Sequence, residues 1–193
     1  VTFAEMDDEG EVDFDTLLCD DGEGGEESCD TAPRVFLGNS VPTNEGSFGA
    51  GLTLFQNLRI NALVDWRGGY KKLDGDRRVR CNLFGLCREN FFPNEFDAIT
   101  MAEVQGGTAF TYNLIRDASF TRLREVSVTY TLPPMLTQYL RTTRASITLA
   151  GRNLGLWTDY PGMDPEASFN SGTRGGAYGQ WEQNVLPQSR QFV

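Results

Sequence analysis

Three carboxylates that lie close together in the sequence are the first residues to consider for chemistry. The stretch "LWTDYPGMDPE" carries Asp159, Asp164 and Glu166, and a pair of carboxylic acids at a suitable separation can hydrolyse a glycosidic bond. The chain contains no His, which excludes Ser-His-Asp triads, Cys-His pairs and His-Glu-x-x-His zinc sites. Because the three acids lie in a stretch rich in Pro and Gly, we interpret them as loop residues. We predict a protein without enzymatic activity, catalytic residues or cofactors.

The charge of the chain is distributed unevenly. The net charge is −10, but residues 1–30 hold thirteen Asp or Glu and no Lys or Arg, so that the remainder is close to neutral. A segment that is rich in acid and Gly and lacks apolar periodicity is typical of an irregular loop. We therefore predict two units: an irregular acidic head at residues 1–32, closed by a disulfide, and a second unit at residues 33–193.

The charged residues also bear on metals and nucleic acids. Asp20, Asp21 and Glu23 are spaced closely enough to suit a hard cation such as Ca²⁺. The residue order of an EF-hand loop is missing, so we favour a solvated acidic loop and predict no metal site. The four arginines between residues 77 and 88 have no aromatic stacking platform beside them, and we predict no nucleic-acid partner.

Four cysteines fall into two close pairs. The pairs Cys19 with Cys29 and Cys81 with Cys87 do not have the Cys-x-x-Cys spacing of a zinc ribbon. Local pairing favours two disulfides in an oxidising compartment of the cell envelope. Free buried thiols in a cytosolic protein are the alternative.

Alternation of polar and apolar residues predicts an antiparallel sheet. The alternating runs are residues 47–55, 58–66, 124–132 and 144–154, with residues 185–193 as the beginning of a fifth strand. The first two runs are separated by a short polar turn, which predicts a hairpin. Residues 134–141 begin on a proline and predict a short helix. Residues 68–118 are too long for a compact hairpin connection and predict a functional loop or lid with some helix.

The predicted fold class is therefore all-β: an antiparallel sheet forming an incomplete barrel-like segment, with long irregular loops and one short helix. Each strand has one apolar face. In a soluble sandwich that face packs on a core, whereas in an outer-membrane barrel it meets lipid. No run of 18 apolar residues predicts a transmembrane helix. The sequence begins at Val1 without a signal-peptide hydrophobic region, from which we expect a processed or internal fragment.

Several of these stretches together resemble one family. "ASFTRLREVSVTYTLP" and "ASITLAGRNLGLWTDYPGMDPE" resemble the C-terminal barrel region of SusC/RagA-type TonB-dependent outer-membrane receptors, and "SFGAGLTLFQNLRINALVDWRGGY" is similar to the preceding strands of that family. The resemblance covers residues 33–193. It implies an antiparallel barrel ancestry, a place in the bacterial cell envelope, on the periplasmic side or in the outer membrane, and a family that imports glycan fragments or peptides.

Strand number limits what this chain can do alone. A barrel avoids open edges only by closing, and even small outer-membrane barrels have about eight strands. We therefore favour a non-catalytic, membrane-extrinsic scaffold subunit that stabilises a larger bacterial membrane protein complex, with a photosynthetic reaction-centre and antenna assembly as a candidate. The alternative is a C-terminal fragment of a SusC/RagA-type transporter that imports nutrients with TonB.

In the favoured interpretation the partners are other protein subunits near a membrane. Large aromatic side chains commonly anchor protein interfaces. The predicted interface residues are Phe91, Phe92, Trp157, Tyr160 and Trp181. The predicted sheet edges are residues 47–55 and 144–153.

Overall fold

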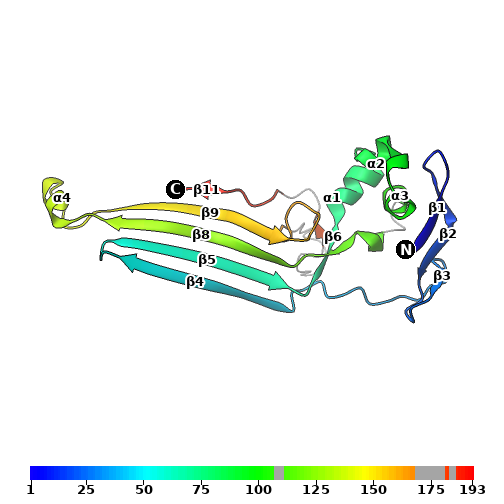
Figure 1. The fold of residues 1–193 in the computed structure, drawn as a ribbon, viewed down its shortest axis with the longest axis horizontal. Coiled ribbons are helices and arrows are strands. Elements are labelled where there is room, and N and C mark those ends of the chain that lie inside the picture. Colours follow the sequence, from blue (N-terminus) through cyan, green and yellow to red (C-terminus); the bar gives the residue numbers. More distant parts are fainter. Residues whose placement is uncertain (107–110, 168–180, 183–185) are drawn as a thin grey trace, which may run out of the picture.

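The computed structural model describes residues 1–106, 111–167, 181–182 and 186–193. The molecule is elongated (Figure 1). A long antiparallel sheet forms one end, and a lobe of short strands and helices forms the opposite end. We define the lobe as residues 1–32 and 75–106. The chain is mainly β-strand with one short helix at the far end of the long sheet, which confirms the predicted fold class.

The long sheet has the strand order β11-β9-β8-β5-β4, and every neighbouring pair is antiparallel. Its strands are β4 (Asn44–Leu54), β5 (Leu58–Gly68), β8 (Phe120–Thr131), β9 (Ser146–Thr158) and β11 (Gln191–Phe192). The predicted hairpin is β4 and β5, and Phe55 and Gln56 adopt the left-handed backbone that reverses the chain. Helix α4 (Pro134–Tyr139) joins β8 to β9, where the sequence predicted it.

Strand register gathers the apolar residues on one face of this sheet. Ile60 lies opposite Val128 across β5 and β8, and Val128 lies opposite Leu149 across β8 and β9. Phe48 and Val64 form a similar pair between β4 and β5. Because side chains alternate along each strand, these rows define one apolar face and leave the polar residues on the other.

A β-bulge in β8 keeps the two faces separate. Against β5, Val64 pairs with Leu123 and Leu63 pairs with Glu125, so that Arg124 is an extra residue in β8. Against β9, Arg124 lies opposite two residues that have no pairing partner in β8, Asn153 and Leu154. A bulge places two consecutive residues on the same side of a strand. Arg124 and Glu125 therefore both face the polar side, while Leu123 and Val126 keep to the apolar side.

A small second sheet joins the long sheet to the lobe. It consists of β6 (Lys71–Asp74), which pairs with β7 (Ile115–Asp117) in antiparallel and with β10 (Trp181–Glu182) in parallel orientation. Tyr70, Ala118, Phe120 and Tyr160 form a buried cluster at this junction.

The lobe contains a third sheet where the sequence predicted an irregular head. Its strands are β1 (Phe3–Met6), β2 (Val12–Asp20) and β3 (Glu26–Ser28), in the order β1-β2-β3. Val12 and Leu17 of β2 are buried against Met101 and Ala102 of helix α3 (Ala98–Gln105). The prediction of an irregular head was wrong because the apolar cover for these strands comes from a helix about 80 residues later in the chain.

The rest of the lobe is built from short helices and two disulfides. The helices are α1 (Gly75–Arg77), η1 (Arg78–Leu83), α2 (Arg88–Phe91) and η2 (Pro93–Glu95), and η3 (Thr111–Leu114) follows α3. Cys19 is bonded to Cys29 and Cys81 to Cys87, which confirms both predicted pairs. Among the described residues, no helix has the length and apolar character needed to cross a membrane.

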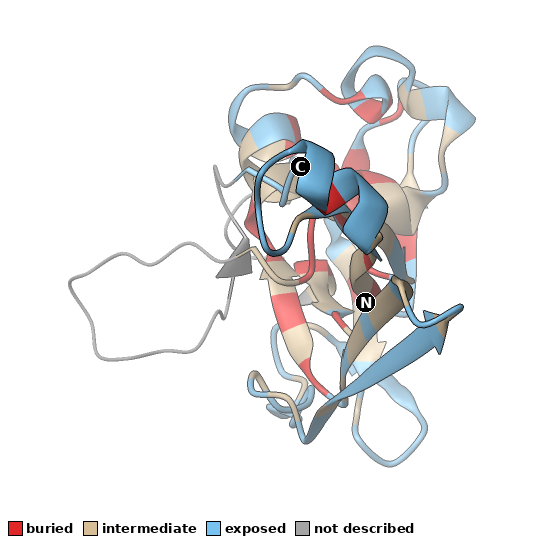
Figure 2. Ribbon diagram, turned by 90° about the vertical axis from the view of Figure 1, so that its left-hand side faces the viewer, coloured by how far each residue is buried: buried red, intermediate tan, exposed pale blue. Residues whose placement is uncertain are grey.

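Burial differs between the parts of the molecule. In the end-on view of Figure 2, buried residues are spread over the lobe and the junction, whereas α4 at the near end is almost entirely exposed. None of the three buried hydrophobic clusters includes a residue of the apolar face of the long sheet.

Candidate functional site

Two arginines of β8 organise the polar face of the long sheet. Arg122 donates to Asp164 at 2.5 Å and lies 3.4 Å from Glu166. Arg124 bonds Asp65 of β5 at 2.6 Å and also donates to Glu166. Arg122 is only 3% exposed and Asp164 only 1%, so this is a buried charge network rather than a surface ion pair.

The acidic partners belong to a short segment, residues 164–167, that we call the latch. Asp164 accepts a hydrogen bond from the backbone N–H of Glu166 at 2.9 Å, which fixes the turn of the latch. Tyr70 and Lys72 donate to the carbonyl of Pro165 at 3.1 and 3.0 Å. The latch is therefore fastened to the sheet through its side chains and its backbone.

The latch also holds the segment that carries β11. The backbone N–H of Gln188 donates to Asp164 at 3.1 Å, and its side-chain amide donates to Glu166 at 2.9 Å. Arg124 donates to the side-chain oxygen of Gln188 at 3.1 Å. Four side chains thus connect β8, the latch and the segment that leads into β11: those of Arg124, Asp164, Glu166 and Gln188.

Electrostatics favours the ionised form of Asp164. Burial by itself would raise the pKa of Asp164, but hydrogen bonds from the backbones of Glu166 and Gln188 and from Arg122 outweigh burial and lower it. Burial raises the pKa of Tyr70 to about 12, so its hydroxyl remains a hydrogen-bond donor at neutral pH. A carboxylate held ionised by arginine is suited to positioning and not to protonating a leaving group.

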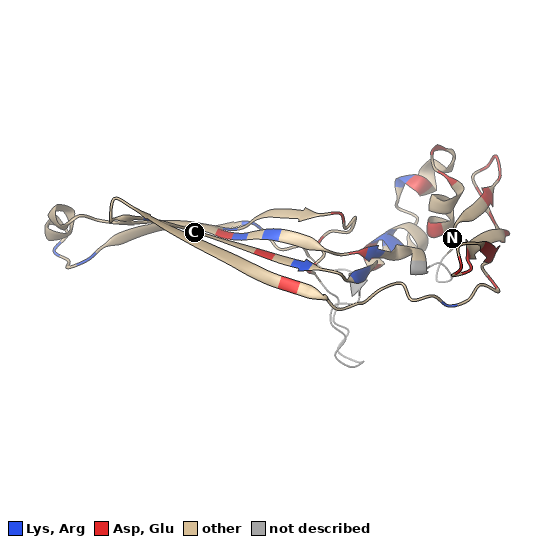
Figure 3. Ribbon diagram, turned by 60° about the horizontal axis from the view of Figure 1, so that its bottom comes forward, with Lys and Arg blue, Asp and Glu red and all other residues tan. Residues whose placement is uncertain are grey.

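Among the residues that the structure describes, the opposite face of the sheet has no comparable network. It presents large apolar side chains to the surroundings, and Leu149 is 67% and Phe48 65% exposed. Figure 3 shows that Lys and Arg lie mainly along the sheet and at its junction, whereas most acidic residues lie on the lobe. Towards α4 the polar face carries neutral hydrogen-bonded pairs, such as Thr129 with Thr148 at 3.0 Å.

The predicted interface residues lie in three separate places. Phe91 and Phe92 are exposed on the lobe, and Trp157 is exposed on the apolar face of β9. Tyr160 is instead buried in the junction cluster, where it serves the core. Trp181 lies in β10, and its side chain is outside the described part of the chain. These residues do not form one surface.

The three weak candidates for a calcium site, Asp20, Asp21 and Glu23, lie in a turn that two of their carboxylates stabilise. Asp20 accepts from the backbone N–H of Gly22 at 2.7 Å, and Asp21 accepts from Glu23 and Gly25, both at 2.8 Å. Within the described residues, no group of three or more His, Cys, Asp or Glu is arranged to hold a metal ion.

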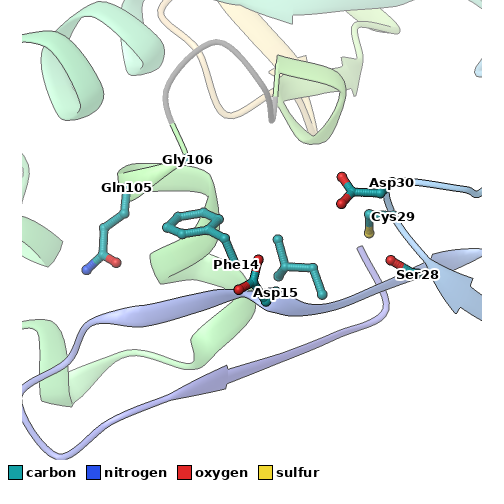
Figure 4. Close-up of a pocket in the computed structure, with 8 residues that line it drawn as sticks. Phe14, Asp15, Ser28, Cys29, Asp30, Gln105 and Gly106 are labelled. Carbon is teal, nitrogen blue, oxygen red and sulfur yellow. The ribbon is translucent and has the colours of Figure 1, made fainter.

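The lobe contains a hollow of about 340 Å³ between β2, β3 and the end of α3 (Figure 4). Phe14 and Leu17 provide apolar surface, and Asp15 and Asp30 provide charge. Gln105, also on its wall, is engaged by the head: its side chain accepts from Val12 and donates to Gly10. We assign no chemistry to this hollow.

The sequence reasoning missed the residues that fasten the latch. The missed residues are Arg122, Arg124, Tyr70, Lys72 and Gln188. One sequence signal was available: Leu123 and Val126 are separated by three positions, which breaks strict alternation and indicates a bulge with Arg124 beside it.

Comparisons with known proteins agree with this architecture. No protein-family model matches the chain. A stretch of 61 residues, 32% of the chain, is 34% identical to TonB-dependent receptor P3 from Formosa agariphila, of which it covers 6%. The fold matches the RagAB peptide importer in its open-open state, with a TM-score of 0.64, 25% identity and coverage of 88% of this chain and 19% of that chain. The closed-closed state gives a TM-score of 0.63, 25% identity and coverage of 92% and 20%.

The matched proteins are named as a receptor and as peptide importers, not as enzymes. Neither comparison supports the photosynthetic assembly that the sequence brought into consideration. The chain spans about a fifth of the length of these solved structures and 6% of the curated receptor. In sequence and fold the chain therefore corresponds to a segment of a SusC/RagA-type TonB-dependent receptor, a kind of protein found in the bacterial outer membrane.

Proposed function

We propose that the chain is a non-catalytic structural component of a larger outer-membrane complex, in which strands of other protein segments complete its sheet. The observation that carries this proposal is the open edge of β4. Among the described strands, β4 pairs only with β5, along all eleven of its residues. An edge of this length presents a row of unpaired N–H and C=O groups, which is a template for another strand.

The second edge of the sheet is also largely open. β11 pairs with β9 at Arg152 and Gly151, and Val193 continues the pairing to Ala150. Within the described residues, the rest of β9 has no partner on this side. In hydrocarbon, each unpaired backbone group costs several kcal/mol, so both edges favour association with further strands.

The two faces of the sheet support a place in a membrane. The exposed residues of the apolar face, such as Phe48 and Leu149, suit hydrocarbon, and the network around Arg122 and Arg124 suits a wet interior. A scaffold in which partner proteins cover the apolar face would satisfy the same residues. Both arrangements make the chain a building element and not an enzyme.

A second candidate function follows from the solved relatives. The RagAB structures are described as a peptide importer, and their fold matches about nine-tenths of this chain. In that candidate the sheet is part of the wall of an importer, and its polar face borders the path of the solute. Transport would then be a property of the complete assembly and not of this sheet.

In-cell crosslinking distinguishes these possibilities. With p-benzoylphenylalanine in place of Ser47 in β4, we expect a crosslink to a neighbouring protein strand, whereas the same group in place of Tyr139 in α4 should give little. Intact mass then separates the candidates. Recovery of a chain near 21.5 kDa supports the scaffold, and recovery of one much longer polypeptide supports the importer wall. Absence of any crosslink at Ser47 together with a monodisperse, detergent-free chain would contradict the proposal.

A further inference from the structure

We propose that a hollow between Trp66 and Trp157, on the apolar face at the lobe end of the sheet, binds the sugar headgroup of a glycolipid. The hollow has a volume of about 430 Å³. Its walls combine two indole rings with polar side chains, including Thr121 and Asp159. No described residue of the latch takes part in it.

Strand register places the two tryptophans on either side of one hydroxyl. Trp66 of β5 lies opposite Thr121 of β8, and Thr121 lies opposite Trp157 of β9. Paired residues share a face of a sheet, and neighbouring strands are about 4.8 Å apart, so the backbones under the two rings are roughly 10 Å apart. This span leaves room over Thr121 for a single pyranose ring.

Two glycines let the indoles lie close to the backbone. A Cβ atom on Gly46 would come within 2.4 Å of the Trp66 ring, and one on Gly155 would come within 2.8 Å of the Trp157 ring. Each ring thus covers a glycine: the Trp66 ring lies over Gly46 of the neighbouring strand β4, and the Trp157 ring lies over Gly155 of its own strand. Trp66 remains 41% and Trp157 59% exposed, so both rings offer surface to a ligand.

The polar groups of the hollow suit hydroxyls. Within the described residues, neither the Thr121 hydroxyl nor the Asp159 carboxylate makes a side-chain hydrogen bond, whereas Thr158 is occupied by the carbonyl of Ser119 at 2.7 Å. The negative face of an indole attracts the polarised C–H groups of a sugar ring. A carboxylate accepts charge-assisted hydrogen bonds from sugar hydroxyls. Arg67 also lines the hollow, but it is paired with Glu45 at 3.3 Å and lies 3.6 Å from Glu166. Because carboxylates already engage this cation and Asp159 would repel an anion, the hollow suits the hydroxyls of a pyranose better than a phosphate.

The surroundings of the hollow favour a lipid-borne sugar over a free one. The next row of the same face contains Phe48, Val64 and Leu123, and the exposed apolar side chains continue along the sheet to Leu149. When the sugar of a glycolipid lies between the tryptophans, the acyl chains of that lipid would lie beside this surface. Tryptophan is also the residue preferred at the level of lipid headgroups. The inference rests on the proposed function only in placing this face against hydrocarbon.

Vesicle flotation of the full chain tests the inference. One set of vesicles contains phosphatidylcholine alone, and the other contains phosphatidylcholine with glucosyl diacylglycerol. We expect stronger binding to the second set, with a blue shift of tryptophan fluorescence. Thr121→Val combined with Asp159→Ala should weaken the binding to glucosyl vesicles about tenfold, since two hydrogen bonds are lost. Thr53→Val, on the opposite face of β4, is the matched control and should change nothing.

Each outcome bears on a different statement. If the double variant binds plain vesicles as strongly as the unmodified chain, the apolar face still enters hydrocarbon. A loss of binding to glucosyl vesicles then reports on the sugar site alone. Equal binding of both vesicle sets would overturn the headgroup site and leave ordinary interfacial tryptophans. Free methyl glucoside, which has no long alkyl chain, binding as tightly as the glycolipid would overturn the lipid source. No binding to any vesicle would instead contradict the proposed place of the sheet in a membrane.

Discussion

The lobe and the long sheet treat apolar side chains in opposite ways. In the lobe, β1 and β2 pack their apolar residues on α3, and a cluster that includes Ala4, Val12 and Met101 is buried. In the long sheet, residues such as Leu52 and Leu149 are exposed although they alternate as regularly as those of any core strand. Alternation therefore shows that each strand has one apolar face, but it does not show what covers that face.

The means of stabilisation differ accordingly. The lobe is acidic, is closed by two disulfides and contains its own core. The sheet is held by its ladders and by the charge network around Arg122 on one face only. The lobe resembles a small secreted domain, and the sheet resembles part of a structure that is completed by its surroundings.

Removal of Arg122 should have the largest effect on this comparison. Arg122→Ala leaves Asp164 buried without its cationic partner and should destabilise the sheet by about 3–5 kcal/mol. Arg152→Ala breaks an exposed pair with Glu125 and should cost no more than about 1 kcal/mol. Urea unfolding in detergent, followed by tryptophan fluorescence, measures both. Similar midpoints for the two variants would show that the network does not stabilise the sheet.

A charge on the apolar face should have the next largest effect. Leu149→Arg should destabilise the bilayer-inserted sheet by about 2–4 kcal/mol, because the guanidinium would enter hydrocarbon. Thr148→Arg, one residue earlier and on the polar face, should be tolerated much better. Folding into lipid vesicles measures the difference. Equal tolerance of the two arginines would contradict the two-faced arrangement.

Removal of a disulfide should separate the lobe from the sheet. Cys19→Ser with Cys29→Ser opens a loop of 10 residues, which should cost the lobe about 2–3 kcal/mol. Hydrogen exchange should rise in β1 and β2 and remain unchanged in β8 and β9. A matching rise in β8 would mean that the two regions unfold together.

The loss of one hydroxyl should have a smaller effect. Tyr70→Phe keeps the ring in the junction cluster and removes the hydrogen bond to Pro165, which should cost about 0.5–1.5 kcal/mol. The change should appear as faster hydrogen exchange around the latch. Unchanged hydrogen exchange around the latch would mean that Lys72 and Arg122 hold the latch on the sheet without Tyr70.

Mild acid should have the smallest effect. The folded pKa of Asp164 is lowered below 3.8, so its contribution is complete above the unfolded pKa and is lost only as pH falls through the folded value. The protection factor of the Gln188 amide, which donates to Asp164, should therefore stay constant from pH 7 to about pH 4 and fall below that, once the slower intrinsic exchange in acid is taken into account. Loss of protection near pH 6 would contradict an ionised, arginine-bound Asp164.

The sequence alone determined the four long strands of the main sheet and their two faces, and it favoured the two local cysteine pairs. These features depend on local rules: a period of two along each strand, a polar turn between two runs, and short separations between cysteines. The resemblance of the motifs around Trp157 and Asp164 to one receptor family also required no structure.

Only the tertiary structure decided which residues work together. The head proved to be a sheet because α3 covers it, and Tyr160 proved to be buried because Tyr70 and Phe120 meet it at the junction. Asp164 lies 42 residues from Arg122 in the sequence, and its role as a bound anion followed from that contact. Local patterns fix what each strand is, but charge pairing and burial depend on segments that the chain brings together only when it folds.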